Sequence, residues 1–161
     1  MAQPSLEFLV VAIANALLDY YGIEAPPVPV REILRSPPPD LARDLSLTEM
    51  LPFGEALWLR LMGGQGAVFV NSDLSEARRR YAMACALFIG LCSSEGGRAA
   101  GLPPLPNDNL REQSTIFGRH FLMPESLLPP GWDRMSANEL ADLFGVPASV
   151  AESRLQEFAD R

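Results

Sequence analysis

The sequence predicts an α+β fold in which a small antiparallel or mixed sheet packs on one long helix, with about five helices in total. Residues 57–62 and 67–70 are apolar segments joined by Gly63-Gly64-Gln65-Gly66, which is the layout of a β-hairpin. The long apolar segment 74–92 follows directly, with helical spacing and no Pro. Other segments show helical periodicity with capping residues at their ends.

The N-terminal third contains one clear helix and several shorter segments. Apolar residues recur at helical spacing from about Ser5 to Tyr21, and Gly22 is placed as a left-handed stop. Residues 23–30 include three prolines and must be extended, whereas residues 31–35 have room for one or two helical turns before Pro37. Residues 41–50 are a weaker helical prediction. In the hairpin, alternation of Leu with other residues predicts a half-buried strand over 57–62.

Capping residues define the remaining helices. We expect capping boxes at Asp73 with Glu76, at Asn109 with Glu112 and at Ser136 with Glu139. They start the long helix 74–92, a helix that ends before Pro124, and a helix over 137–144. A Gly- and Pro-rich loop should span 95–108, and a last helix 148–158.

Composition limits the class of protein. With 161 residues, 48% of them hydrophobic, the chain fits one domain over 1–161, in which 1–132 form the sheet and core helices and 133–161 a helical hairpin packed on that core. The net charge of −7 opposes nonspecific attraction to nucleic acid or anionic membranes. No segment approaches the roughly 20 apolar residues of a membrane span. No signal peptide is recognisable, so we expect a cytoplasmic protein.

Four separated segments carry a resemblance to a known family. They are 15–33, with Pro26-Pro27; 68–84, with Arg80, Tyr81 and Ala84; 117–124, ending Leu-Met-Pro; and 139–155, with Leu-Ala-x-x-Phe-x-Val and Arg-Leu. In this order they resemble the ImmA/IrrE metallopeptidases of bacteria and phages. The resemblance implies a zincin-like long helix that reads roughly Arg-Phe-x-x-Ala-His-Glu-x-Gly-His and binds zinc.

The zinc-binding residues of that family are not found in this chain. Such a peptidase needs two His four residues apart on one helix face, a Glu after the first as general base, and a third ligand. By the resemblance, the first His, the base and the second His fall on Cys85, Ala86 and Ile89. The third ligand falls near Arg111 or Gln113, where Glu112 is the only acidic residue. If the alignment is shifted so that Gly90 matches the Gly of the family motif, these positions fall on Leu87, Phe88 and Leu91 instead. The sequence therefore argues against zinc, and predicts a degenerate cleft at Cys85, Ala86, Ile89, Glu112 and His120.

Three other kinds of chemistry remain open from the residues. A rebuilt metal site could use Cys85, Cys92, Glu95, Asp108, Glu112 and His120, although their spacing matches no standard pattern. Cys85 could pair with His120 as a nucleophile. The alternative is purely structural: both cysteines are core residues, and His120 is a half-exposed packing or capping residue. The helical hairpin 136–158 imitates a helix-turn-helix, but residues 133–161 carry six acidic side chains against three Arg, a poor surface for phosphates.

The sequence thus leads to a hypothesis about function. We expect a catalytically inactive metallopeptidase-like protein that binds a protein or peptide partner, and the family resemblance suggests a helix-turn-helix transcriptional regulator. Two alternatives are a zinc-dependent peptidase with an altered metal site and a structural domain whose apolar cleft forms a homodimer.

Overall fold

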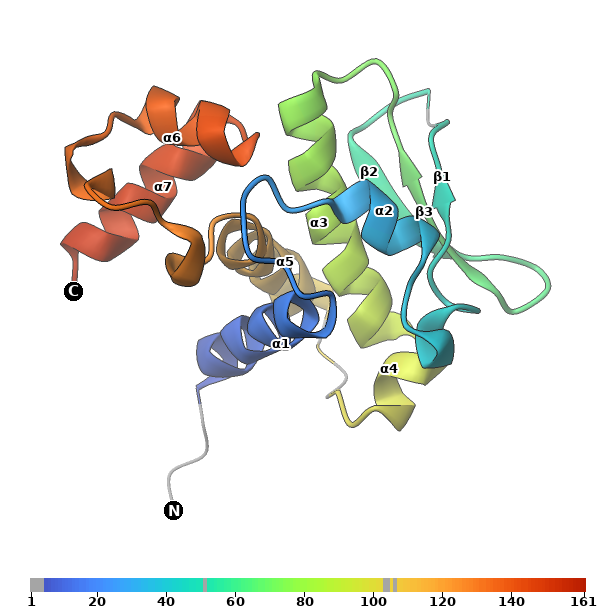
Figure 1. Ribbon diagram of the computed structural model, residues 1–161. Coiled ribbons are helices and arrows are strands. Elements are labelled where there is room, and N and C mark those ends of the chain that lie inside the picture. The colour runs from blue at the N-terminus through green and yellow to red at the C-terminus, as the bar shows by residue number, and fades with distance from the viewer. Residues whose placement is uncertain (1–4, 51, 103–104, 106) are drawn as a thin grey trace.

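The computed structural model describes residues 5–50, 52–102, 105 and 107–161. Within these residues there are seven α-helices and a three-stranded mixed sheet, which confirms the α+β class. The helix α3 (Glu76–Ser93) lies on the sheet, and most of the other helices lie on the far side of α3 (Figure 1). The helix count exceeds the predicted five because two short helices, α2 and α4, are added to the five longer ones. No helix in this part of the chain combines the length and apolarity needed to cross a bilayer.

The element boundaries lie close to those predicted for the long helices. The helices are α1 (Leu6–Tyr20), α2 (Val30–Arg35), α3 (Glu76–Ser93), α4 (Glu95–Ala99), α5 (Asn107–Leu122), α6 (Ala137–Phe144) and α7 (Ala148–Ala159). The strands are β1 (Leu47–Thr48), β2 (Ala56–Arg60) and β3 (Gly66–Val70), and short 3-10 turns lie at Pro39–Leu41, Glu125–Leu127 and Trp132–Arg134.

The predicted hairpin forms the main part of the sheet. β2 and β3 pair antiparallel with Trp58 opposite Val68, while the two-residue strand β1 runs parallel to β3 on its other side. The strand order is therefore β1-β3-β2, and β2 is an edge strand. The face of the sheet that carries Val68 and Trp58 packs on α3, where a Cβ at Gly90 would lie only 2.7 Å from Trp58 Cδ1. Glycine at this position allows the indole to lie directly on the helix.

The helix predicted over 41–50 is wrong, because the backbone of this segment bonds to other elements. The carbonyl oxygen of Arg43 accepts from the N–H of Gly66, and that of Ser46 accepts from the N–H of Val68. The Asp44 carbonyl oxygen accepts from Trp58 Nε1 at 2.8 Å. Carbonyl groups that would bond along a helix are therefore used to hold the hairpin.

The long helix α3 lies at the centre of the molecule, between the sheet and α5 (Figure 1). Its N-cap is Ser75, whose Oγ accepts from the N–H of Arg78, so the predicted capping box at Asp73 is wrong. Asp73 instead donates its N–H to the side chain of Asn71 in a turn before the helix. Since Ser is as good a cap as Asp, the choice between them depends on where the strand-to-helix turn ends.

The other end of α3 also differs from the prediction. The loop predicted over 95–108 contains α4, which is capped by the Ser94 side chain. Residues 103, 104 and 106 of that loop lie outside the described residues. The helix α5 begins at Asn107, so the predicted cap Asn109 lies inside it.

The C-terminal helices follow the prediction closely. The capping box of Ser136 with Glu139 is present, and α6 ends at Gly145 with a left-handed φ of 62°. The helix α7 meets the segment just after α5 through the buried side chain of Arg154, whose Nε donates to the carbonyl oxygen of Met123 at 3.1 Å.

Candidate functional site

One face of α3 is less covered than the rest of the helix. Tyr81, Cys85 and Ile89 are half-buried, whereas the six residues between them are buried. Their spacing of four residues places these three side chains in one row along the helix. This row includes two of the positions at which the resemblance places zinc ligands, Cys85 and Ile89.

The row forms the floor of a groove that runs between β2, α5 and α7. Two pockets of about 220 and 300 Å³ make up the groove, and they share Glu55 and Tyr81. The first is lined by Glu55, Ala56, Tyr81, Ala82, Cys85, Ala86, Ile89, Arg111, Ser114 and Thr115. The second is lined by Glu55, Arg78, Tyr81, Pro147, Ser149 and Val150. We call these residues together the α3 groove.

The helix α5 closes one side of the groove by close approach to α3. At Gly118, a Cβ would lie 2.9 Å from Tyr81 Cε2 and 3.0 Å from Cys85 Sγ. A side chain at this position would force the helices apart, so glycine sets their separation here. The close approach also explains why the Cys85 thiol is largely shielded from solvent.

This shielding determines the chemistry of the groove floor. Burial raises the pKa of the Cys85 thiol to about 12, with a smaller opposing effect from its hydrogen bond with Tyr81. Burial also raises the pKa of Tyr81. Because the thiolate is the nucleophile and the metal ligand, a thiol that stays protonated at neutral pH is chemically quiet. Above the floor, Arg78 forms an ion pair with Glu55.

The residues of the groove do not fit a zinc ion. A zinc site takes three or four nitrogen, sulfur or oxygen ligands. Of the three residues on α3 at the ligand and base positions, Cys85 alone has a donor atom, while Ala86 and Ile89 have none. In the described part of the chain, no three His, Cys, Asp or Glu side chains lie close enough to share a metal ion. No catalytic step through zinc follows from this arrangement.

His120 lies outside the groove. Its Nε2 is 3.5 Å from Glu157 Oε2, between α5 and α7. The residue is only 7% exposed, so the prediction of a half-exposed position is wrong. Burial, with the positive charge of Arg154 as the next cause, lowers the pKa of His120 to about 4. His120 is therefore neutral at neutral pH and faces α7, whereas Cys85 faces Tyr81, so the structure does not bring these two residues together.

The structure separates the remaining predicted site residues. Cys85, Ala86 and Ile89 line the groove together, Glu112 is exposed outside the set that lines it, and Cys92 is buried in the core. Sequence reasoning missed Glu55, which reaches the groove from a distant segment, whereas it had placed the third ligand near Arg111, which does line the groove. Tyr81 could have been found, because it lies one helical turn before Cys85.

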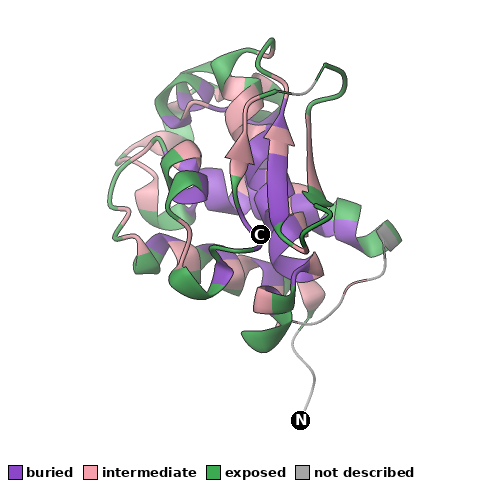
Figure 2. Cartoon of the chain, turned by 90° about the vertical axis from the view of Figure 1, so that its right-hand side faces the viewer, coloured by how far each residue is buried: buried purple, intermediate pink, exposed green. Residues whose placement is uncertain are grey.

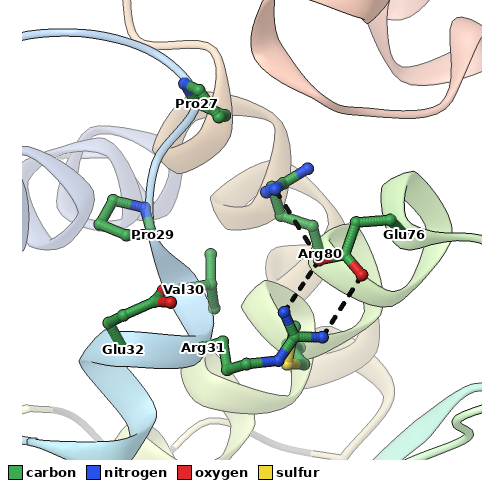
Figure 3. A pocket seen from close by; sticks show the side chains of 8 residues that line it. Pro27, Pro29, Val30, Arg31, Glu32, Glu76 and Arg80 are labelled. Carbon is green, nitrogen blue, oxygen red and sulfur yellow. Dashed lines mark hydrogen bonds and ion pairs between the residues drawn. The ribbon is translucent and has the colours of Figure 1, made fainter.

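A separate pocket of about 220 Å³ lies between α2 and α3 (Figure 3). Arg31 of α2 donates to Glu76 at 3.0 Å and to Glu49 at 2.9 Å. Arg80 donates to the Gly145 carbonyl oxygen at 2.6 Å and lies 3.9 Å from Glu76. Because both guanidinium groups that line this pocket are paired within the chain, we interpret it as a link that joins α2, α3 and the turn between α6 and α7.

Comparison with known proteins identifies the family. A Mycobacterium tuberculosis transcriptional regulator of known structure shares the fold, with a TM-score of 0.54 and 14% identity over 88% of this chain. The present chain spans 44% of that protein's length. No curated protein matches the sequence. The model of the IrrE N-terminal-like domain matches residues 54–156, which include the hairpin, the α3 groove and most of α7. This match confirms the resemblance noted from the sequence, and the chain belongs to the IrrE N-terminal-like domain family.

Proposed function

We propose that this protein is a non-catalytic member of its family that binds an extended segment of a partner protein in the α3 groove. The observation that carries the proposal is that an open groove is present although only Cys85, of the three α3 positions, has a donor atom. Cys85, Ala86 and Ile89 occupy the positions of two ligands and the general base, and the open pocket remains above them. A site with this shape and no reactive group can bind a chain but has no means to cleave it by the family mechanism.

The free edge of β2 supports binding of an extended peptide. Glu55 accepts from the N–H of Asn71 and Leu61 donates to Gln65, so the odd-numbered residues of β2 bond to β3. In an antiparallel pair the alternate residues then direct their backbone groups away from the partner strand. Ala56 and Trp58 are such residues, and Ala56 lines the groove. A peptide strand could add to this edge through main-chain hydrogen bonds.

The charge of the chain favours a basic partner. The net charge of −7 gives long-range attraction to proteins with basic surfaces, and DNA-binding proteins have such surfaces. The family resemblance suggests a helix-turn-helix transcriptional regulator as the partner, and we infer a regulatory role on that basis. The acidic surface of 133–161 speaks against direct DNA binding by this chain.

Metal analysis and a cleavage assay test the absence of catalysis. The protein is purified after expression in zinc-supplemented medium, and bound zinc is measured by mass spectrometry for the wild type and for Cys85→Ser. We expect no stoichiometric zinc and no chelator-sensitive cleavage of an unfolded protein substrate. Stoichiometric zinc that disappears in Cys85→Ser, or cleavage that a chelator stops, overturns the proposal.

A binding experiment tests the role of the groove. Short peptides are selected on the immobilised protein from a random phage-displayed library, and their affinities are measured by calorimetry. Ser149 and Ser153 are both exposed and lie one turn apart on α7, but only Ser149 lines the groove. We expect Ser149→Trp to weaken the selected peptides at least tenfold and Ser153→Trp to leave them unchanged. Equal effects of the two substitutions would place the binding elsewhere.

A further inference from the structure

The elements around the α3 groove offer different chemistry to a bound segment. One is the start of the edge strand β2, which Figure 2 shows half-buried and then exposed, beside the buried strand β3. Another is α5, from which Arg111, Ser114 and Thr115 line the groove. The strand edge offers main-chain groups, which are the same for any sequence. The side chains of α5 are therefore better placed to distinguish one segment from another.

The charged side chains that line the groove are opposite in sign to the molecule as a whole. Glu55 is negative and Arg78 and Arg111 are positive, which gives the lining a charge of +1. Tyr81 and Cys85 also line the groove, but burial raises the pKa of both side chains, so they stay neutral. The whole chain has a net charge of −7. At short range, charge complementarity therefore favours an anionic group in the bound segment.

Of the two arginines, one already has a partner in the groove. Arg78 forms an ion pair with Glu55. The guanidinium group of Arg111 makes no hydrogen bond or ion pair with any residue that the structure describes, and Asp108, one turn earlier on α5, does not pair with it. A cationic group in a ligand would have to displace Arg78 from Glu55. A carboxylate would find Arg111 unoccupied.

The hydroxyl groups on α5 leave Arg111 as the donor on this side of the groove. Ser114 Oγ donates to the carbonyl oxygen of Arg111 at 2.7 Å, and Thr115 Oγ1 donates to that of Glu112 at 2.7 Å. A hydroxyl whose proton is already used offers only lone pairs. These oxygens can accept from N–H groups of a bound segment, but they cannot donate to a carboxylate. A guanidinium group can, because its planar fork of N–H groups matches a carboxylate in bidentate geometry.

We infer, on the basis of the proposed function, that Arg111 selects the segment bound in the α3 groove by binding a carboxylate, either of an Asp or Glu side chain or of the segment's C-terminus. Main-chain bonds along β2 give affinity that does not depend on sequence, whereas this contact makes binding depend on one group. The basic surface expected of the whole partner acts at a different range. Net charge guides the approach of the two proteins, and Arg111 contacts one group after they meet.

Peptide binding to the wild type and to Arg111 variants tests this role. Random peptides with free C-termini are selected on the immobilised full chain, and their affinities are measured by calorimetry. Analogues are then made in which each Asp or Glu is replaced by Asn or Gln, or the C-terminus by an amide. One of these replacements should weaken binding to the wild type by about fivefold or more, and it identifies the source of the carboxylate. In Arg111→Gln the same replacement should change the affinity by less than about twofold.

Arg98 on α4 provides a matched control. It is exposed like Arg111, its side chain has no partner among the described residues, and it does not line the groove. Arg98→Gln removes the same charge and should keep the full dependence on the carboxylate. Arg111→Glu should instead select segments with a basic group, and a variant that fails to fold cannot produce such a reversal.

Two sets of results distinguish failure of this role of Arg111 from failure of the proposed function. If Ser149→Trp weakens the selected peptides but no carboxylate replacement does, or if Arg111→Gln and Arg98→Gln behave alike, the groove binds a segment that Arg111 does not select. If no peptide binds, or if Ser149→Trp leaves binding unchanged, the proposed function fails and the role of Arg111 fails with it.

Discussion

His120 should make the stability of the protein depend on pH in a way that one substitution removes. It is the only histidine of the chain, so any titration of a histidine belongs to it. Burial, with Arg154 as the next cause, lowers its pKa from the ordinary 6.5 to about 4, while Glu157 opposes the shift and Arg119 and Arg161 add to it. The native state therefore binds the imidazole proton less readily than the unfolded state does.

The sign and size of the effect follow from proton linkage. Where the unfolded state binds more protons, the free energy of unfolding decreases as the pH falls. The stability from the neutral imidazole is thus fully present above the unfolded pKa of 6.5 and is lost as the pH falls toward about 4. Between about pH 7.5 and about pH 5 the full shift corresponds to about 2 kcal/mol. We expect a loss of about 1–2 kcal/mol over this range, because Glu157 beside the imidazole opposes the shift.

Urea denaturation at several pH values, for the wild type and His120→Leu, measures this loss. The variant keeps an apolar side chain of similar size between α5 and α7 and leaves the ion pairs of Glu157 with Arg119 and Arg154 in place. It should lose about 1–2 kcal/mol less than the wild type over this range. Parallel stability curves for the two proteins would refute the reasoning. So would a histidine NMR signal that titrates near its ordinary pKa in the folded protein.

Three further predictions concern buried groups. Arg154→Met should lower the free energy of unfolding by about 3 kcal/mol, because it leaves the buried carbonyl group of Met123 without its donor and removes one of the two Arg partners of Glu157; Arg134→Met, at an exposed position, should change it by less than about 0.5 kcal/mol, and urea denaturation compares them. Gly118→Val should cost about 1–3 kcal/mol by overpacking the contact between α5 and α3, whereas Gly63→Ala, with no heavy atom within 4 Å of its new methyl group, should be tolerated; similar losses in both would contradict the proposed contact. Burial raises the pKa of the two cysteine thiols to about 12 and about 11, so iodoacetamide should modify them at neutral pH only in denaturant, and mass spectrometry would detect any modification of the folded protein.

The helices and the hairpin could be predicted from the sequence because their signals are local. The Ser136–Glu139 capping box and Gly145 mark the two ends of α6, and the glycine-rich turn after residue 62 identifies the hairpin. The segment 41–50 could not be predicted in this way. Its backbone carbonyl groups bond to β3 and Trp58, so its conformation is set by residues that are distant in sequence. A two-residue strand such as β1 has no periodicity of its own to detect.

The sequence could predict which residues of the candidate site lie on α3, but not which residues of other elements face them. Cys85, Ala86 and Ile89 follow from position in one helix, since residues four apart share a face. The side chains that face them from β2 and α5 depend on how those elements cross α3. His120 is an example. The sequence correctly placed it on a helix, but the prediction that its side chain lies in the cleft was wrong. Only the packing of α7, through Arg154 and Glu157, shows that it points away from the groove.

The central position of α3 explains why a site on this helix that has lost its metal, as we propose, becomes apolar. The helix contacts α2, α4, α5, β2 and β3, and no charged residue occurs between Arg80 and Glu95. A His or Glu left there without a metal ion would be a partly buried polar group without a partner, at a cost of about 1–3 kcal/mol each. Ala86, at which the resemblance places the general base, is 1% exposed, so a carboxylate there would have little access to water. Ile89 and Cys85 face the groove, where apolar side chains keep its floor intact without chemistry. Such a groove floor fits the binding without cleavage that we propose for this protein.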